Sequence, residues 1–263
     1  MLCCPVCAKS LTYTDHTARC EHGHSFDIAR EGYINLLRGS KSGDKIGDDK
    51  YSARSRRDFL NKGYYAPLKD ALVATFQDKQ GTLLDICCGE GYYTSALGEN
   101  ENLDVYGFDI AREMIRLAAK RGRGTYFVAN MASIPVEDAV FDYAVHLFAP
   151  FKEEEFFRIL KPGGSLYTVV PGKDHLFGLK QALYDTPYHN DEKLPETKFL
   201  QLVDTRKITA QILLENPQDI ESVFRMTPYY FHTSETDRSK LKAFETLQTP
   251  IEFVIAHYQK PEV

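Results

Sequence analysis

The stretch Leu83-Leu84-Asp85-Ile86-Cys87-Cys88-Gly89-Glu90-Gly91 is an apolar run that passes directly into a glycine-rich turn. A second apolar run, residues 105–108, ends at Asp109, roughly twenty residues beyond the turn. Glycine lets a ligand lie close against bare backbone, and the helix expected after the turn offers unpaired N–H groups. An acid at the end of the next strand is placed to accept both hydroxyls of a ribose. The two segments therefore predict a pocket for an adenosine-containing cofactor.

The amino-acid sequence of the turn indicates which cofactor is bound. Dinucleotide-binding turns carry a third glycine, but here Gly91 is followed by Tyr92-Tyr93-Thr94. The segment 85–91 instead resembles motif I of the S-adenosylmethionine (SAM) methyltransferases, and SAM has no pyrophosphate to cradle. This resemblance places Asp85, Gly89, Gly91 and Asp109 at the cofactor. The alternative is a glycine turn that binds nothing, which Asp109 and the downstream segment 160–164 argue against.

The chain has 263 residues, 43% of them hydrophobic, which suits one large domain and one small one. We expect a metal-binding module at 1–37, a basic linker and helix at 38–62, and a cofactor domain at 63–263. No stretch approaches the ~20 uncharged apolar residues of a membrane span. The first residues lack the basic and apolar regions of a signal peptide, so we expect a cytoplasmic protein.

Four of the six cysteines lie within the first twenty residues, which favours a metal site over a disulfide framework. Cys4, Cys7, Cys20 and His24 follow the pattern C-x2-C-x12-C-x3-H. Three thiolates and an imidazole in a tetrahedron select zinc, and a full set of protein ligands leaves no open position for catalysis. The pattern predicts a structural zinc in a segment too short to build its own core.

Cys3 and His22 are the alternative ligands of this site. The spacing from Cys3 to Cys7 is one residue too long for the usual turn, so Cys3 is expected to be a bystander. His22 lies two residues from Cys20, which makes a cramped chelate. A cluster of reduced cysteines without metal is the remaining alternative.

The net charge of −5 argues against indiscriminate binding of nucleic acid, but one segment is basic. Residues 38–62 hold eight basic residues and four acids, a net charge of +4. Arg54, Arg56 and Arg57 lie in this segment and are predicted to contact RNA phosphates. The alternative is a solvated helix face on which they pair with nearby acids such as Asp58.

The remaining pattern alternates between strands and helices. Residues 17–26 and 32–37 are expected to form strands that close the metal module, and 39–49 reads as a linker. Residues 51–74 have helical spacing, interrupted at Pro67 near a helix start. This alternation predicts an α/β fold with a parallel, doubly wound sheet. Strands are expected at 83–87, 104–108, 126–129, 141–147, 165–170 and, as a half-buried edge, 251–257; helices are expected at 92–97, 112–120 and 153–160.

Four further residues lie within or just after the predicted strands. Asn130 is placed to bond an adenine edge while Met131 packs on its face, or both belong to an ordinary turn. His175 follows the fifth strand, at the edge where ligands of open α/β sheets gather. His146 lies within an apolar strand and is expected to be a core histidine.

The whole chain resembles the bacterial 23S rRNA (guanine-N1)-methyltransferases, which join an N-terminal zinc module to a Rossmann-like SAM-dependent domain. The matching positions are Cys4, Cys7, Cys20, His24, 26–37, 47–48, 53–54, 56–57, 59–60, 63–68, 85–94, 160–164, 171–172, 175–176 and 226–228. The resemblance implies that Tyr65, the Gly89-Glu90 step and His175 contact SAM. It also implies a 23S rRNA hairpin as substrate and a homodimer whose zinc modules flank an RNA cleft.

The chain departs from this family where Cys87 replaces the usual glycine, and we expect Cys87 to adopt a negative φ. The start of the segment 146–150 also differs, beside the expected entry of the target base. No residue is assigned as general base. Five aromatic residues are candidate platforms for a base taken out of its RNA stack: Tyr64, Phe148, Tyr188, Tyr229 and Tyr230.

Two other functions fit parts of the pattern. One is a SAM-dependent methyltransferase of a small molecule, in which the zinc module serves interaction. The basic segment speaks against it. The other is a non-catalytic zinc- and RNA-binding protein with a degenerate cofactor domain, which the intact Gly89, Gly91 and Asp109 oppose.

Overall fold

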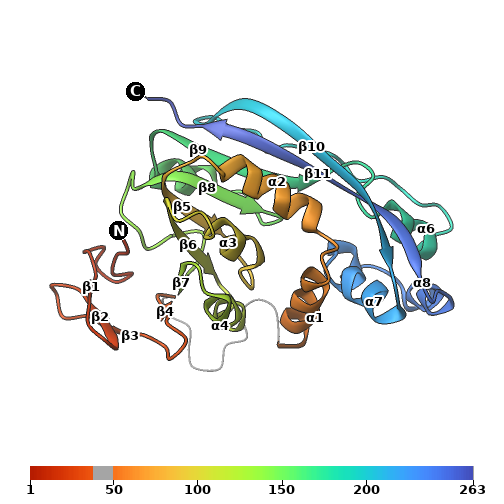
Figure 1. The fold of residues 1–263 in the computed structure, drawn as a ribbon, viewed down its shortest axis with the longest axis horizontal. Helices are drawn as coiled ribbons and strands as arrows, with labels where there is room; N and C mark the ends of the chain where they lie inside the picture. The colour runs from red at the N-terminus through yellow and green to blue at the C-terminus, as the bar shows by residue number, and fades with distance from the viewer. Residues whose placement is uncertain (38–49, 263) are drawn as a thin grey trace.

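The computed structural model describes residues 1–37 and 50–262. The predicted linker 39–49 and the first residues of the basic segment lie outside the described residues. Figure 1 shows a small N-terminal module at one end, a central sheet, and two long strands that reach toward a group of helices at the other end. No helix in the described part of the chain is long and apolar enough to cross a membrane.

The main sheet has eight strands in the order β10-β11-β9-β8-β5-β6-β7-β4. The six strands from β9 to β4 run parallel, while β11 and β10 are antiparallel to their neighbours. The chain order reverses between β5 and β8, so the turn after β5 lies at the switch point, where open α/β sheets bind ligands. The strands are β4 Ile34–Asn35, β5 Gly81–Ile86, β6 Leu103–Asp109, β7 Thr125–Val128, β8 Phe141–Leu147, β9 Leu160–Pro171, β10 Gln201–Leu214 and β11 Leu247–Gln259.

Both faces of the sheet are apolar, because alternate residues of each buried strand point to opposite sides. Leu83 belongs to a core shared with α2, α3, α6 and α7, whereas the adjacent Leu84 packs with α5 and the N-terminal module. The helices are α1 Lys50–Asn61, α2 Ala66–Phe76, α3 Tyr92–Leu97, α4 Arg112–Arg121, α5 Glu153–Ile159, α6 Phe177–Leu183, α7 Pro217–Arg225 and α8 Glu235–Lys240, with 3-10 turns η1 Pro228–Phe231 and η2 Leu241–Ala243.

The N-terminal module contains a three-stranded antiparallel sheet of β1 (Thr12–Tyr13), β2 (Thr17–Arg19) and β3 (Ser25–Asp27). It is fastened to the loop that follows β7. Leu2 forms a β-bridge with Val136, and the Cys3 N–H donates to the Pro135 carbonyl at 2.8 Å. Leu2 is also buried in the second core. The module is therefore docked on the larger domain by backbone pairing and apolar burial.

The predicted helices and parallel strands are confirmed, with Pro67 in the first turn of α2. Two predictions about the sheet were wrong, and a third was correct in part. The segment 32–37 meets the metal module at an antiparallel bridge between Ile28 and Ile34, but its strand β4 also pairs with β7 of the main sheet. The strand expected at the edge, β11, is an interior strand, and the edge is the unpredicted β10. The sheet is consequently mixed and not all-parallel.

Candidate cofactor site and metal centre

The turn after β5 presents bare backbone to open space, as predicted. Gly89 and Gly91 have φ values of +55° and +79°, a region that favours glycine. A Cβ on Gly91 would lie 2.8 Å from the Cβ of Ala118 in α4, so the close approach of α4 requires a glycine there. A Cβ on Gly89 would meet nothing within 4 Å. The backbone at Gly89 is therefore open to a ligand.

Cys87 has a φ of +58°, so the prediction of a negative φ was wrong. The chain keeps the left-handed backbone although a side chain is present, at a cost of ~1–2 kcal/mol. The thiol Sγ lies 3.8 Å from Sδ of Met131. Met131, which was predicted to pack on the adenine, thus lies directly against the turn.

Asp109 ends β6, the strand beside β5, and its carboxylate holds the turn in place. Oδ2 accepts the Gly89 N–H at 3.1 Å, and Oδ1 accepts the Ala111 N–H at 2.8 Å. The position fits the predicted role.

Asp85 is buried, and its Oδ2 accepts a hydrogen bond from Oγ1 of Thr94 at 2.5 Å. Burial raises the pKa of Asp85 to about 7, although the bond from Thr94 opposes this shift. Thr94 had no assigned role in the sequence. A hydroxyl residue in the first turn of the helix after the glycines was the available signal.

The side chain of Glu90 is held by Arg121 of α4. Its Oε2 lies 2.5 Å from Nε of Arg121 in α4, and Arg121 also donates to Asn61 at 2.7 Å. Burial raises the pKa of Glu90, and Arg121 opposes this shift. Oε1 is buried and has no hydrogen-bond partner within residues 1–37 and 50–262. Nε of Arg121 also donates to the Glu90 carbonyl at 3.2 Å, so Oε1 is the acceptor of Glu90 that the surrounding protein leaves unsatisfied.

Tyr65 and His175, distant in sequence, meet in the structure. Oη of Tyr65 lies 3.2 Å from Nε2 of His175, and the Glu252 N–H donates to Nδ1 of His175 at 3.3 Å. Because Nδ1 accepts, the neutral ring carries its proton on Nε2 and donates it to Tyr65. Burial lowers the pKa of His175 to about 3. Both side chains of this pair are therefore neutral and held in place. The Tyr65 hydroxyl accepts from His175 and can donate its own proton to a ligand.

Two other residues near the strand ends are engaged locally. Oδ1 of Asn130 accepts the Ala132 N–H at 2.9 Å and thereby shapes its own loop. His146 is buried between Oγ1 of Thr168, at 2.6 Å, and the Pro150 carbonyl, at 3.2 Å, so it is a core histidine as expected.

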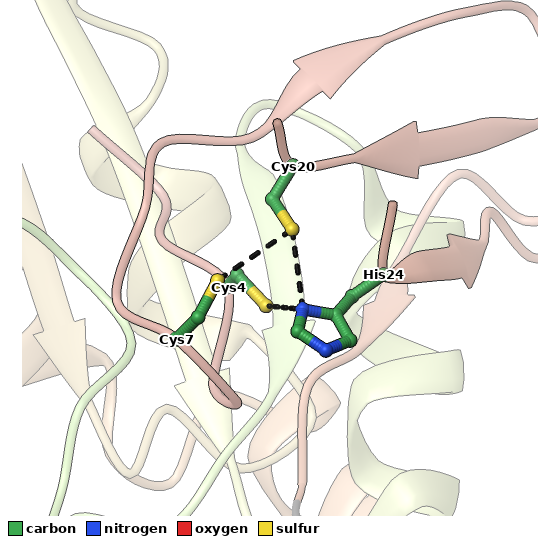
Figure 2. A group of neighbouring side chains, drawn as sticks. All are labelled: Cys4, Cys7, Cys20 and His24. Atoms are coloured by element: carbon green, nitrogen blue, oxygen red, sulfur yellow. Dashed lines mark hydrogen bonds between the residues drawn. The ribbon is translucent and has the colours of Figure 1, made fainter. Parts of the chain in front are cut away.

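The predicted metal ligands converge in the N-terminal module (Figure 2). All four ligand atoms lie within 4.8 Å of one another. His24 Nδ1 is 3.5 Å from Cys4 Sγ and 3.3 Å from Cys20 Sγ, and the sulfurs of Cys7 and Cys20 are 3.6 Å apart. A tetrahedral zinc with Zn–S bonds of ~2.3 Å separates its sulfurs by about 3.8 Å. The donor set and its spacing fit zinc.

The rival ligands lie outside this cluster. Cys3 is buried, but its Sγ faces the Met1 carbonyl at 4.0 Å, and His22 Nε2 lies 3.8 Å from Glu21. Within the cluster, burial opposes ionisation of Cys20, but hydrogen bonds from Cys7 and from the backbone of His24 outweigh burial and lower its pKa to about 6. A thiol that ionises readily is suited to metal binding.

The three arginines of α1 face different surroundings. Arg54 is exposed, whereas Arg56 and Arg57 are half-buried on the side of the helix that also buries Ala53 and Leu60. The charges of Arg57 and Arg56 both lower the pKa of Glu90 in the cofactor turn. Only Arg54 faces solvent as an RNA contact would.

A doubly wound sheet with a glycine turn at its switch point, an acid on the adjacent strand and a separate Cys3His cluster defines a SAM-dependent methyltransferase that carries a zinc ribbon. Residues 83–164 match the family described as "Methyltransferase domain", and residues 2–41 match the family described as "RlmA, N-terminal".

Similar proteins indicate the reaction more specifically than these two family descriptions do. The putative 23S rRNA (guanine-N(1)-)-methyltransferase YxjB of Bacillus subtilis is 30% identical over 269 residues, which cover 96% of this chain and 94% of that protein. The 23S rRNA (guanine(748)-N(1))-methyltransferase of Streptomyces fradiae is 37% identical over 68% of this chain and 66% of its own length. A putative enzyme of the same description from Micromonospora griseorubida is 32% identical, with 68% of each chain covered. The chain belongs to the 23S rRNA (guanine-N1)-methyltransferase family.

Proposed function

We propose that this protein transfers the methyl group of SAM to N1 of a guanine in a 23S rRNA hairpin, in the cytoplasm. The proposal rests mainly on one observation, that a zinc-type cluster and a site suited to SAM occur in the same structure. A zinc-type cluster is docked by backbone pairing onto a domain whose glycine turn and Asp109 fit SAM. The similarity to YxjB over nearly the whole chain supports the same substrate.

Methyl transfer from SAM depends mainly on the alignment of the methyl group with the nucleophile. SAM supplies a methyl group that is already strongly electrophilic, so the protein must hold it in line with the nucleophile. We assign this task to the open backbone at Gly89, the Asp109 carboxylate and the Tyr65–His175 pair, with Asp85, Glu90, Gly91, Asn130 and Met131 around them. Guanine N1 must also lose its proton, to a carboxylate, a histidine or a relayed water. The proposal leaves this base unassigned.

We further propose that three regions of the chain have separate roles. Residues 1–37, with zinc on Cys4, Cys7, Cys20 and His24, recognise RNA and perform no chemistry; residues 38–62 add basic contacts, and 63–263 bind SAM and catalyse. We also propose a homodimer. The exposed edge strand β10 supports it, because an edge offers unpaired backbone groups and Leu202 and Val203 on it are 50% and 54% exposed.

The arginines of α1 can be tested separately. Arg54→Gln should weaken binding of the 23S rRNA hairpin and reduce the salt slope of log K by about one unit, because one phosphate contact is lost. SAM binding should not change. Arg56→Gln, on the side of the cofactor turn, should weaken SAM binding as well. Filter binding across a salt series measures the first effect, and calorimetry with SAM measures the second.

Lys242→Gln is the control, since it removes one exposed charge from η2, far along the chain from α1. If the variant with Arg54, Arg56 and Arg57 all changed to Gln binds and methylates RNA like wild type at every salt concentration, the basic helix is only a solvated face.

The substrate class is tested with labelled SAM. The protein should transfer label to unmodified 23S rRNA and leave a pool of cellular metabolites unlabelled. Label in the metabolite pool alone would favour a small-molecule methyltransferase. SAM and RNA binding without any transfer would favour a non-catalytic binding protein.

A further inference from the structure

Phe148 follows the last residue of β8 and is one of the few large apolar side chains left in contact with solvent, with 47% of its surface exposed. Strands β5 and β8 are adjacent and parallel, with Ile86 paired to His146. Counting two residues on along each strand brings Phe148 level with Cys88, at the start of the cofactor turn. The ring therefore emerges at the carboxyl edge of the sheet, beside the predicted SAM site.

The backbone at Phe148 is strained. Its φ of +55° lies in the left-handed region, which a side chain disfavours relative to glycine. Exposure of a phenyl ring to water is a second cost. Strained residues that the fold nevertheless maintains cluster at binding sites. Here the strained conformation holds an exposed aromatic ring beside the predicted SAM site.

Phe148 is the outer member of a row of aromatic rings. Its centroid lies 5.7 Å from that of Phe253 in β11. Phe253 in turn lies 4.6 Å from His175 and 5.0 Å from Tyr65. The row runs from the predicted cofactor contacts to solvent, so a flat group that lies on Phe148 is next to those contacts.

The other candidate platforms are engaged elsewhere. Tyr64 is buried and donates to Asp219 at 2.6 Å. The ring of Tyr230 is covered by the guanidinium of Arg238, 4.5 Å from its centroid, and Tyr229 packs against the first core. Tyr188 is exposed, but its ring lies 4.1 Å from the Lys180 ammonium. None of these four follows a parallel strand of the sheet.

We propose that Phe148 is the stacking platform that holds the target guanine after it leaves the RNA stack. This inference rests on the proposed function, since it concerns the substrate of that reaction. A flat purine presents a π-face to the ring, and its N1 edge remains free to point toward the methyl donor. Phe148 takes no part in bond making and acts as a positioning residue.

The test uses Phe148→Ala, Phe148→Leu and Phe148→Tyr with an unmodified 23S rRNA transcript. Base–aromatic stacking contributes ~1–3 kcal/mol, so the Ala variant should lose at least about fivefold in kcat/KM for RNA. The loss should lie mainly in kcat, because phosphate contacts dominate overall RNA affinity. The Leu variant should resemble the Ala variant, and the Tyr variant should retain activity. The Kd for SAM should not change.

Two controls separate stacking from stability. Phe148→Gly relieves the positive φ, so it should be at least as heat-stable as the Ala variant and equally impaired in methyl transfer. Phe231→Ala removes the ring of the more exposed Phe231 in η1, 77% exposed, and should act like wild type. Full activity of the Ala variant, or a Leu variant as active as the Tyr variant, would overturn the inference alone. A wild-type protein that never methylates RNA would overturn the proposed function, and the inference with it.

Discussion

Replacing Cys7 with serine should reduce the bound zinc from one ion per chain to nearly none, while SAM binding stays within about threefold of wild type. Structural zinc sites bind with an apparent ~10–16 kcal/mol that is largely folding free energy, so the N-terminal module should lose its order. Cys7 is the informative ligand because it is half-exposed, whereas Cys4 and Cys20 are also buried in the second core. Metal analysis and calorimetry with SAM give the two quantities.

Cys3→Ser is the matched control for this prediction. Cys3 is a buried cysteine of the same module, but it lies outside the ligand cluster, so its replacement should leave the zinc content unchanged. Should SAM binding disappear together with the zinc in Cys7→Ser, the two regions are not functionally separate. Full zinc retention in Cys7→Ser would show that a different set of residues holds the metal.

Asp109→Ala should weaken SAM binding by ~1–3 kcal/mol, or roughly 5- to 150-fold in Kd, because the ribose hydroxyls lose their acceptor when they are buried. The structure adds a second reason. The same carboxylate accepts the Gly89 N–H, so its removal also loosens the turn that the cofactor must lie against. Isothermal titration with SAM measures the change, and a melting curve shows that the protein remains folded.

Asp104→Ala controls for the loss of a negative charge, since Asp104 is an exposed acid on the same strand, β6. Its Kd for SAM should match that of wild type. An Asp109→Ala protein with an unchanged Kd would show that this acid is not the ribose partner, and the cofactor would then have to lie elsewhere along the edge of the sheet.

The parts of the fold that could be predicted are those that depend on the spacing of residues close together in the sequence. The zinc cluster follows from four residues within the first twenty-four, and the turn with Asp109 follows from two apolar strands that each end at a polar signal. Strand β10 was missed because apolar residues alternate only in its second half, from Ile208 to Leu214, whereas seven consecutive residues from Gln201 are exposed. The interior position of β11 depends on β10, so the two errors have one cause.

Contacts between residues far apart in the sequence could not be predicted either. Arg121, which binds Glu90, and Phe253, which joins His175 to Phe148, lie on elements whose contacts with the cofactor turn depend on the complete fold. The positive φ of Cys87 was missed for a different reason. The sequence indicated that a side chain would displace the glycine conformation, but the packing of strand and helix around the turn outweighs the local strain at this residue.

The identity of the methylated nucleoside shows whether this protein is a guanine-N1 methyltransferase of 23S rRNA. Purified protein, labelled SAM and an unmodified 23S rRNA transcript are incubated, and the RNA is then digested to nucleosides and separated. We expect the label to elute as 1-methylguanosine, at no more than one methyl group per transcript, and Asp109→Ala at limiting SAM to yield much less. Label in any other nucleoside, or an unlabelled transcript under conditions where the protein binds SAM, would contradict this expectation.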